Sequence, residues 1–216
     1  MRSIEMESTR MNRWLAVIGA LCLAVASLPA RAQEQTAIAQ HARELAIGVC
    51  GVCHGPDGNS KNPMFPRLAG QRAWYLVQQL QAFQDESRGD PYAIAYMWGM
   101  ARKLHAPTIE ALAQYFSRQK TGPGKRYDQA RLARGREIFE HGVPSQGVPA
   151  CAVCHGPHAL GSNTFPRLAG QHAEYILKQL ASFQSNMRNI AIMHGVAQNL
   201  PKPQMEAVAD YLASLR

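Results

Sequence analysis

Residues 50–56 read Cys50-Gly-Val-Cys53-His54-Gly-Pro56, and residues 151–157 read Cys151-Ala-Val-Cys154-His155-Gly-Pro157. A Cys-x-x-Cys-His motif is typical of covalent haem attachment, because its thiols bond the two vinyl groups of one porphyrin and the adjacent His reaches the iron. A zinc site would need further Cys or His at matching places in both copies, and none repeat. A thioredoxin-like pair would need a βαβ context, which the sequence lacks, and a plain disulfide is the remaining alternative. The motifs therefore predict two covalently bound haem c groups, with His54 and His155 as axial ligands.

A second run shows that the chain contains two copies of one unit. Phe65-Pro-Arg-Leu-Ala-Gly-Gln71 recurs unchanged as residues 165–171, and thirteen of the twenty positions in 65–84 are identical in 165–184. Solenoid repeats are roughly 20–50 residues long, so a period near one hundred indicates duplication of a whole domain. Between the copies, Thr121–Arg126 is rich in Gly, Pro and charge and predicts a linker. We expect an N-terminal domain over 33–121 and a C-terminal domain over 122–216.

Both copies predict the same order of helices. The first helix precedes the cysteine motif, the second carries apolar residues at spacings that make one face, and the last begins at a proline. The expected positions are Thr36–Val49 and Gln129–His141, then starts near Gln71 and Gln171, then starts near Pro107 and Pro203. No run alternates regularly between apolar and polar residues, so we predict an all-α fold. Domains of about 90 residues are small for a core of side chains alone, and a buried haem would supply apolar mass.

The first 32 residues predict a secretory signal peptide. Arg10 and Arg13 precede an apolar run that ends at Leu28, and Ala30-Arg31-Ala32 has the small-x-small pattern of a signal peptidase site. The run is too short to span a membrane, and no second apolar stretch of about 20 residues follows. Cys22 follows a leucine rather than a small residue, which disfavours a lipoprotein, so we expect it to leave with the signal. The segment indicates export to the periplasm.

The composition is that of a globular protein with a moderate positive charge. Hydrophobic residues make up 46% and charged residues 18%, which excludes a disordered or fibrous chain. The net charge is +8, and beyond residue 32 the chain keeps 19 basic and 13 acidic residues, a balance of +6. Such a charge steers encounters with an acidic partner or a membrane surface, although a solvated surface is the simpler interpretation. No basic cluster with interleaved aromatics occurs, which argues against a nucleic-acid partner.

The repeat also selects the second axial ligand of each iron. Six methionines follow residue 32: Met64, Met97, Met100, Met187, Met193 and Met205. Aligning the copies on the segments that contain them pairs Met97 with Met193, each followed by Gly two residues later and Leu seven residues later. The other four face different residues; Met187, for example, falls opposite Pro91. We predict Met97 and Met193 as ligands, with Met100 as the rival in the first copy and His194 as the alternative in the second.

A His/Met ligand pair determines what the haem does. Thioether ligation favours ferrous iron and raises the potential, and two strong axial ligands leave no coordination position for a substrate. We therefore predict an electron-transfer protein rather than an enzyme, with no small-molecule substrate.

The repeated Phe-to-Gln run is a candidate for the haem surround. We expect a proline carbonyl, that of Pro66 or Pro166, to accept the proton of the histidine nitrogen that does not bind iron. Arg67 and Arg167 suit a haem propionate, because the guanidinium fork matches a carboxylate. Alternatively, these are loop and cap residues that recur only because the domain was duplicated.

On these residues, the chain beyond the signal resembles the cytochrome c4 family of periplasmic dihaem cytochromes. The resemblance rests on both cysteine motifs, both Phe-to-Gln runs, Met97 and Met193. It implies two cytochrome-c-type domains related by a pseudo-twofold axis, propionates near their interface and His/Met ligation of both haems. It also implies electron transfer in a respiratory chain, with quinol–cytochrome c reductase as donor, a terminal oxidase as acceptor and loose attachment to the membrane.

One position departs from that family. Its members commonly have Gly in the first helix of each domain, where that helix crosses the last. Gly135 fits this place in the second copy, but Leu45 occupies it in the first, so a close helix crossing is expected only in the C-terminal domain.

Two other functions stay open. An electron-accepting subunit of a dehydrogenase is one, since flavocytochrome sulfide dehydrogenases use similar dihaem subunits. A dihaem peroxidase or thiosulfate-oxidising enzyme is the other, although dihaem peroxidases are usually longer and keep one haem open to peroxide, whereas both copies here offer a Met. The ligand pattern favours the electron carrier.

Overall fold

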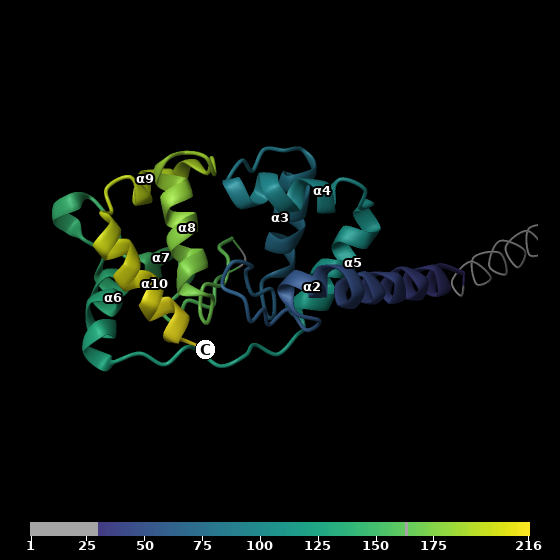
Figure 1. Ribbon diagram of the computed structural model, residues 1–216, viewed down its shortest axis with the longest axis horizontal. Coiled ribbons are helices and arrows are strands. Elements are labelled where there is room, and N and C mark those ends of the chain that lie inside the picture. The colour runs from purple at the N-terminus through teal and green to yellow at the C-terminus, as the bar shows by residue number, and fades with distance from the viewer. Residues whose placement is uncertain (1–29, 163) are drawn as a thin grey trace, which may run out of the picture. The chain divides into compact units, whose positions relative to one another are not determined.

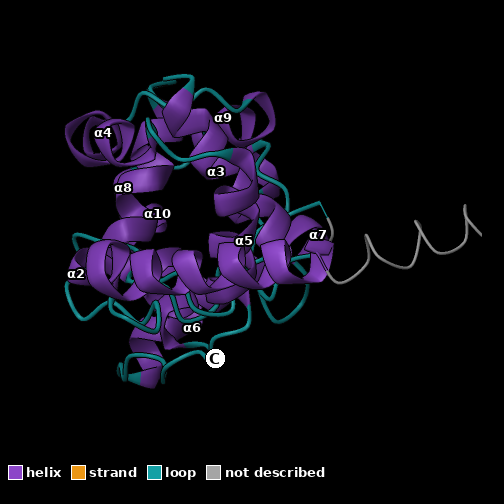
Figure 2. Cartoon of the chain, turned by 90° about the vertical axis from the view of Figure 1, so that its right-hand side faces the viewer, coloured by secondary structure: helices purple, strands orange, loops and turns teal. Residues whose placement is uncertain are grey.

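The computed structural model describes residues 30–162 and 164–216. Figure 2 shows only helices and loops in this part of the chain, and the pairing of extended backbone is limited to two isolated bridges, Arg88–Arg188 and Val143–Val148. The all-α prediction is therefore confirmed. The predicted signal peptide, with Cys22, lies outside the described residues except for residues 30–32. None of the described helices combines the length and apolar character that crossing a bilayer requires.

Residues 42–216 form one compact unit, in which Figure 1 shows two clusters of helices joined by an extended segment. The N-terminal cluster follows a helix over 30–45 and contains η1 (Ala46–Cys50), α2 (Gly51–His54), α3 (Ala73–Gln84), η2 (Ala93–Met97), α4 (Trp98–Ala101) and α5 (Ala106–Ser117). The C-terminal cluster contains α6 (Gln129–His141), η3 (Pro144–Gln146), α7 (Cys151–His155), α8 (Ala173–Gln184), α9 (Ala191–Ala197) and α10 (Lys202–Ser214). The order of helices repeats, as predicted.

Local sequence explains where these helices begin and end. The carboxylate of Asp128 caps α6 by accepting the backbone N–H of Ala130 at 2.8 Å. The same helix ends before Gly142, whose φ of 73° few other residues adopt. Pro107 lies in the first turn of α5, where its missing N–H costs no helical hydrogen bond. The first helix of the N-terminal domain differs from the prediction, because its last turn widens to the π form at Ala46–Cys50.

The first and last helices of the C-terminal domain cross closely. A Cβ atom at Gly135 would overlap the backbone carbonyl oxygen of Ala207 in α10, so only glycine permits this approach. The crossing leads into a core of Phe139, Leu200, Met205, Val208 and Leu212.

The N-terminal domain packs the equivalent helices with alanines. Ala42 and Ala46 are fully buried against Leu112 and Phe116 of α5. Leu45 is half-buried and faces the cavity described below. Methyl-sized side chains thus replace the glycine that the sequence lacks here.

From Phe65 and Phe165 as far as Arg88 and Arg188, equivalent residues of the two domains are 100 positions apart. The backbone N–H of Arg88 bonds the carbonyl of Ala82, that of Arg188 bonds the carbonyl of Ser182, and the two arginines pair in the isolated bridge. The four extra residues of the first domain therefore lie between Arg88 and Met97. This corrects the expected pairing of Met187 with Pro91, since Met187 precedes Arg188 just as Ser87 precedes Arg88.

A candidate dihaem site

A single cavity of about 680 Å³ reaches both cysteine motifs. Its wall includes Cys50, Cys53 and His54 from the first domain and Cys151, Cys154 and His155 from the second. Most of the other lining side chains are apolar or aromatic, among them Phe65, Leu76, Phe83, Phe165, Ile176 and Phe183. An apolar chamber beside paired thiols and a histidine is the environment that a covalently bound porphyrin requires.

Both histidines are held with one ring nitrogen already engaged. His54 Nδ1 lies 2.9 Å from the carbonyl oxygen of Pro66, and His155 Nδ1 lies 3.0 Å from that of Pro166. A carbonyl only accepts, so Nδ1 carries the proton and Nε2 keeps its lone pair. Burial lowers the pKa of both imidazoles, which favours the neutral form that a metal binds. Each histidine is thus oriented by a backbone acceptor and left with a free donor atom for iron.

The four cysteines are placed for thioether bonds rather than for thiolate chemistry. All are free and partly buried on the cavity wall. Burial raises the pKa of Cys50 and raises that of Cys151 to about 11, so both thiols are protonated at neutral pH. Over residues 30–162 and 164–216, no three His, Cys, Asp or Glu side chains gather as a metal-binding group.

Four methionines line the cavity, and they differ in exposure. Met97 and Met193 are half-buried, and Met97 packs against the small core of Phe83 and Ala101. Met100 is 48% exposed, and the Met64 thioether takes the hydroxyl of Tyr96 at 3.9 Å. Of the other described methionines, Met187 and Met205 are not on the wall. The pair chosen by the repeat is therefore also the more buried pair on the wall.

His194 is directed elsewhere. Its Nδ1 lies 2.8 Å from the carbonyl oxygen of Phe183, within its own domain. This hydrogen bond links α9 to the end of α8, so the imidazole of His194 has a structural role.

Three residues of the cavity wall have a buried N–H group with no acceptor among the described residues. These groups are Nε of Arg67, Nε of Arg167 and the indole N–H of Trp74. A buried N–H left unpaired is costly, and haem propionates would supply the missing acceptors. The residues present thus fit the cofactor. The repeat gives no signal for Trp74, because its counterpart in the second copy is Glu174.

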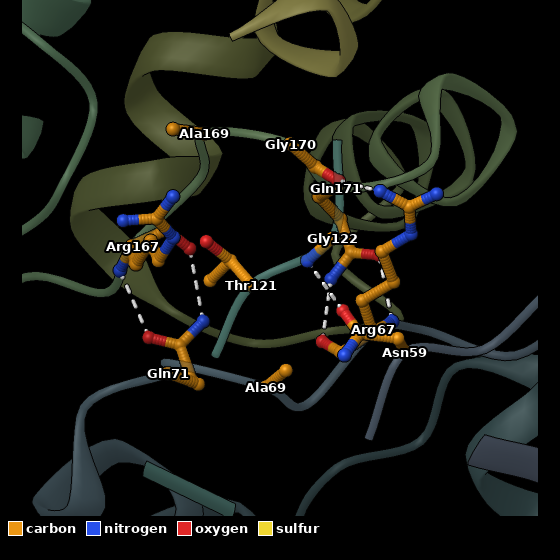
Figure 3. A pocket seen from close by; sticks show the side chains of 10 residues that line it. All are labelled: Asn59, Arg67, Ala69, Gln71, Thr121, Gly122, Arg167, Ala169, Gly170 and Gln171. Carbon is orange, nitrogen blue, oxygen red and sulfur yellow. Dashed lines mark hydrogen bonds between the residues drawn. The ribbon is translucent and has the colours of Figure 1, made fainter. Parts of the chain in front are cut away.

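The Phe-to-Gln runs also meet each other, which is why Arg67 and Arg167 lie at the interface (Figure 3). The Gln171 amide accepts the N–H of Arg67 at 2.8 Å and donates to the Arg67 carbonyl at 2.9 Å. Gln71 makes the same two bonds to the backbone of Arg167, both at 2.9 Å. The guanidinium of Arg67 reaches further, to the carbonyl of Gly170 at 2.9 Å. We call these four reciprocal bonds the glutamine clamp.

A second interdomain contact lies between α3 and α8. Arg88 donates to Gln79 Oε1 at 2.7 Å in its own domain and to Gln179 Oε1 at 2.9 Å in the other. Arg188 mirrors it, bonding Gln179 at 2.6 Å and Gln79 at 2.7 Å. Both guanidiniums are buried and belong to the cavity wall. Arg88 recurs as Arg188 in the sequence, but nothing in the sequence indicates that the two side chains meet.

Both domains of this chain are similar to those of known cytochromes c. The family model described as Cytochrome c matches residues 39–119 and 132–216. Cytochrome c-552 of Acidithiobacillus ferridurans is 42% identical, covering 77% of this chain and 73% of that protein. Cytochrome c4 of Stutzerimonas stutzeri is 41% identical, covering 78% and 85%. A thiosulfate dehydrogenase electron acceptor of Thiomonas intermedia is 39% identical, covering 76% and 77%.

Solved structures give the same result for the fold. Cytochrome c4 of Acidithiobacillus ferrooxidans has a TM-score of 0.73 at 42% identity, covering 77% of this chain and 98% of that one. Reduced cytochrome c4 of Pseudomonas stutzeri has a TM-score of 0.74 at 39% identity, covering 82% and 98%. Two domains with one Cys-x-x-Cys-His motif each, in this fold, bind two covalent haem c groups.

Proposed function

The chain belongs to the cytochrome c4 family of dihaem electron-transfer proteins, and on that premise we propose that His54 with Met97, and His155 with Met193, are the axial ligands through which it carries single electrons in a periplasmic respiratory chain. The donor is a quinol–cytochrome c reductase, and the acceptor is a terminal oxidase. Residues 1–32 are the export signal, and the mature domains span 33–121 and 122–216.

One observation carries the ligand assignment. In each domain the cavity wall presents a neutral histidine with a free Nε2 and a half-buried methionine at equivalent places in the repeat. A bound haem supplies one-electron chemistry between ferric and ferrous iron. The surrounding residues orient the histidine through a proline carbonyl, exclude water with aromatic side chains and offer propionate partners in Arg67 and Arg167.

Carbon monoxide tests the ligands directly. The dithionite-reduced holoprotein is mixed with carbon monoxide, and its visible spectrum is recorded before and after. An unchanged spectrum with two low-spin haems per chain supports six-coordinate iron in both domains. A carbon monoxide adduct at either haem contradicts the proposal, because that iron would have an open or labile sixth position.

A second candidate is the electron acceptor of a dehydrogenase. It is favoured by the Thiomonas intermedia relative, which is described as a thiosulfate dehydrogenase electron acceptor and aligns over 76% of this chain. The chemistry of the two haems is identical in both roles, so only the protein that reduces them differs.

Stopped-flow reduction separates the two roles. The oxidised protein is mixed either with purified quinol–cytochrome c reductase and quinol, or with thiosulfate dehydrogenase and thiosulfate. Faster reduction by the reductase supports the respiratory carrier. Faster reduction by the dehydrogenase, together with loss of activity in the absence of this protein, supports the second role instead.

A further inference from the structure

In the first domain, a glutamine joins the segment that bears Met97 to the preceding long helix. Gln84 is the last residue of α3, and its Nε2 donates to the carbonyl oxygens of Ala101 at 3.1 Å and Leu104 at 2.7 Å. Ala101 is the last residue of α4, and Leu104 lies in the turn after it. One side chain of α3 therefore holds the chain just beyond Met97.

The second domain repeats this contact. Gln184 is the last residue of α8, and its Nε2 donates to the carbonyl oxygens of Ala197 at 3.2 Å and Leu200 at 3.1 Å. Ala197 is the last residue of α9, the helix that contains Met193. In both domains, a glutamine at the end of one helix thus holds the methionine segment by its backbone carbonyls.

The glutamine contact is the same although the connecting segments differ in length. The glutamine and its two carbonyl partners are 17 and 20 residues apart in the first domain, and 13 and 16 residues apart in the second. The extra residues of the first domain are accommodated before the turn that the glutamine binds. The contact therefore fixes the end of the methionine segment independently of the path that leads to it.

Other side-chain attachments of these segments differ between the domains. The indole of Trp98 donates to the carbonyl oxygen of Arg88 at 2.9 Å. At the equivalent place in the second domain, the ring of His194 bonds the carbonyl oxygen of Phe183 at 2.8 Å. The glutamine is thus an attachment that both domains share.

The glutamine bonds lie close to the place where the methionine side chain packs. Met97 packs against the small core that contains Phe83, the neighbour of Gln84, and Ala101, its hydrogen-bond partner. Ala101 and Ala197 are fully buried, and the hydrogen bonds to their carbonyls are partly buried. Partial burial limits competition from water, so these bonds stabilise the arrangement in which the methionine lines the cavity.

We propose that Gln84 and Gln184 are positioning residues for the sixth ligands, each holding its methionine segment on the preceding helix and so keeping Met97 or Met193 on the iron. Neither glutamine is on the cavity wall, so neither acts as a ligand. Departure of the thioether displaces the segment that carries it, and the glutamine bonds oppose this displacement. The inference rests on the axial ligands proposed above.

Imidazole binding to the ferric holoprotein measures how firmly each methionine is held, because imidazole reaches the iron only after the thioether has left. Gln84→Ala should raise the imidazole affinity of the first haem about three- to tenfold, and Gln184→Ala should do the same at the second haem. The methionine-to-iron charge-transfer band reports loss of the thioether. Haem methyl NMR resonances assigned to each domain show which haem has responded.

Gln81→Ala is the matched control, because Gln81 is an exposed residue of the same helix, three positions before Gln84. It should leave both imidazole affinities within about twofold of wild type. Gln84→Leu separates the hydrogen bond from packing, since leucine retains an apolar side chain of similar bulk but has no N–H donor. This variant should bind imidazole as Gln84→Ala does.

Three results would overturn the inference: unchanged imidazole affinity at the matching haem, equal effects of one substitution at both haems, or wild-type affinity in Gln84→Leu. A lower melting temperature with unchanged affinity belongs to the first, because the glutamine would then stabilise the fold without holding the ligand. Gln184 is exposed, so Gln184→Ala provides the test if Gln84→Ala fails to fold. Absence of the charge-transfer band from the wild-type protein would instead contradict the ligand proposal itself.

Discussion

In each haem-attachment motif, the two ring nitrogens of the histidine differ in their hydrogen bonding. Nδ1 bonds a backbone carbonyl, and Nε2 keeps its lone pair. Pro66 and Pro166 supply backbone carbonyls, and a carbonyl cannot be removed by side-chain substitution. The methionines proposed as ligands, in contrast, would act through their side chains and are open to mutation. Substitution of a single residue therefore tests the methionines more directly than the proline carbonyls.

Replacing Met97 or Met193 with alanine should open one iron each. Either variant should bind about one carbon monoxide per chain after reduction, because loss of the thioether leaves the sixth position free. Met100→Ala is the control, since Met100 lines the same cavity but is not paired by the repeat. Carbon monoxide binding by Met100→Ala, with none by Met97→Ala, would assign the ligand to Met100.

Asp90, which is buried and forms an ion pair with Nε of Arg88 at 2.6 Å, should make stability depend on acid pH. Its folded-state pKa is lowered, so its stabilising effect is complete above its unfolded pKa of 3.8 and disappears as pH falls through the lower folded value. Thermal unfolding of wild type and Asp90→Asn, measured from pH 7 down to strong acid, should show a difference that shrinks below about pH 4. A constant difference across this range would mean that Asp90 contributes through packing alone.

At the level of elements, the helix crossing at Gly135 is the most demanding contact. Gly135→Ala should destabilise the holoprotein by about 1–3 kcal/mol, because its Cβ would force α6 away from the backbone of α10. Gly195→Ala is the matched control in the same domain, since nothing lies within 4 Å of an added Cβ there. That substitution should be neutral or stabilising by up to about 1 kcal/mol. Equal melting temperatures for the two variants would refute the close crossing.

Sequence patterns predicted the elements better than they predicted the contacts between them. The start of α6 was predictable because Asp128 is a strong capping residue, and α3 and α8 carry clear apolar faces. The π turn at Ala46–Cys50 has no sequence signal, because it follows from fitting a helix end to its surroundings.

In the candidate site, too, some residues were predictable from sequence patterns and others were not. The two haem-attachment motifs were predictable because haem attachment fixes their spacing, and the methionines remain a prediction that rests on their pairing in the repeat. Trp74 and Asp90 were not predictable, since each occurs in one domain only and a comparison of copies passes over what they do not share. The glutamine clamp was also missed as a contact, because the repeat shows that two runs are alike but not that they touch.

For the whole molecule, the glutamine clamp should determine how the domains unfold. Gln71→Ala removes both partners of the Arg167 backbone and should cost about 1–3 kcal/mol. The double variant Gln71→Ala/Gln171→Ala should convert a single cooperative melt, followed by calorimetry, into two transitions. Gln114→Ala, on an exposed face of α5, is the control and should melt as wild type does. A double variant with one unchanged transition would show that the clamp does not couple the domains.

The symmetry of the glutamine clamp bears on how strongly the two domains must attract each other in order to stay together. Each half makes the same bonds to the other, which is the contact pattern of two identical chains in a symmetric dimer. Here the halves are tethered by the segment after Thr121, whose Gly122 N–H bonds Asn59 and whose Lys125 N–H bonds Ala213. A short tether holds its ends at an effective concentration on the order of millimolar. Contacts far too weak to assemble free subunits at cellular concentrations therefore suffice to keep the two haem sites together, and the interface is free to be polar and to carry charge.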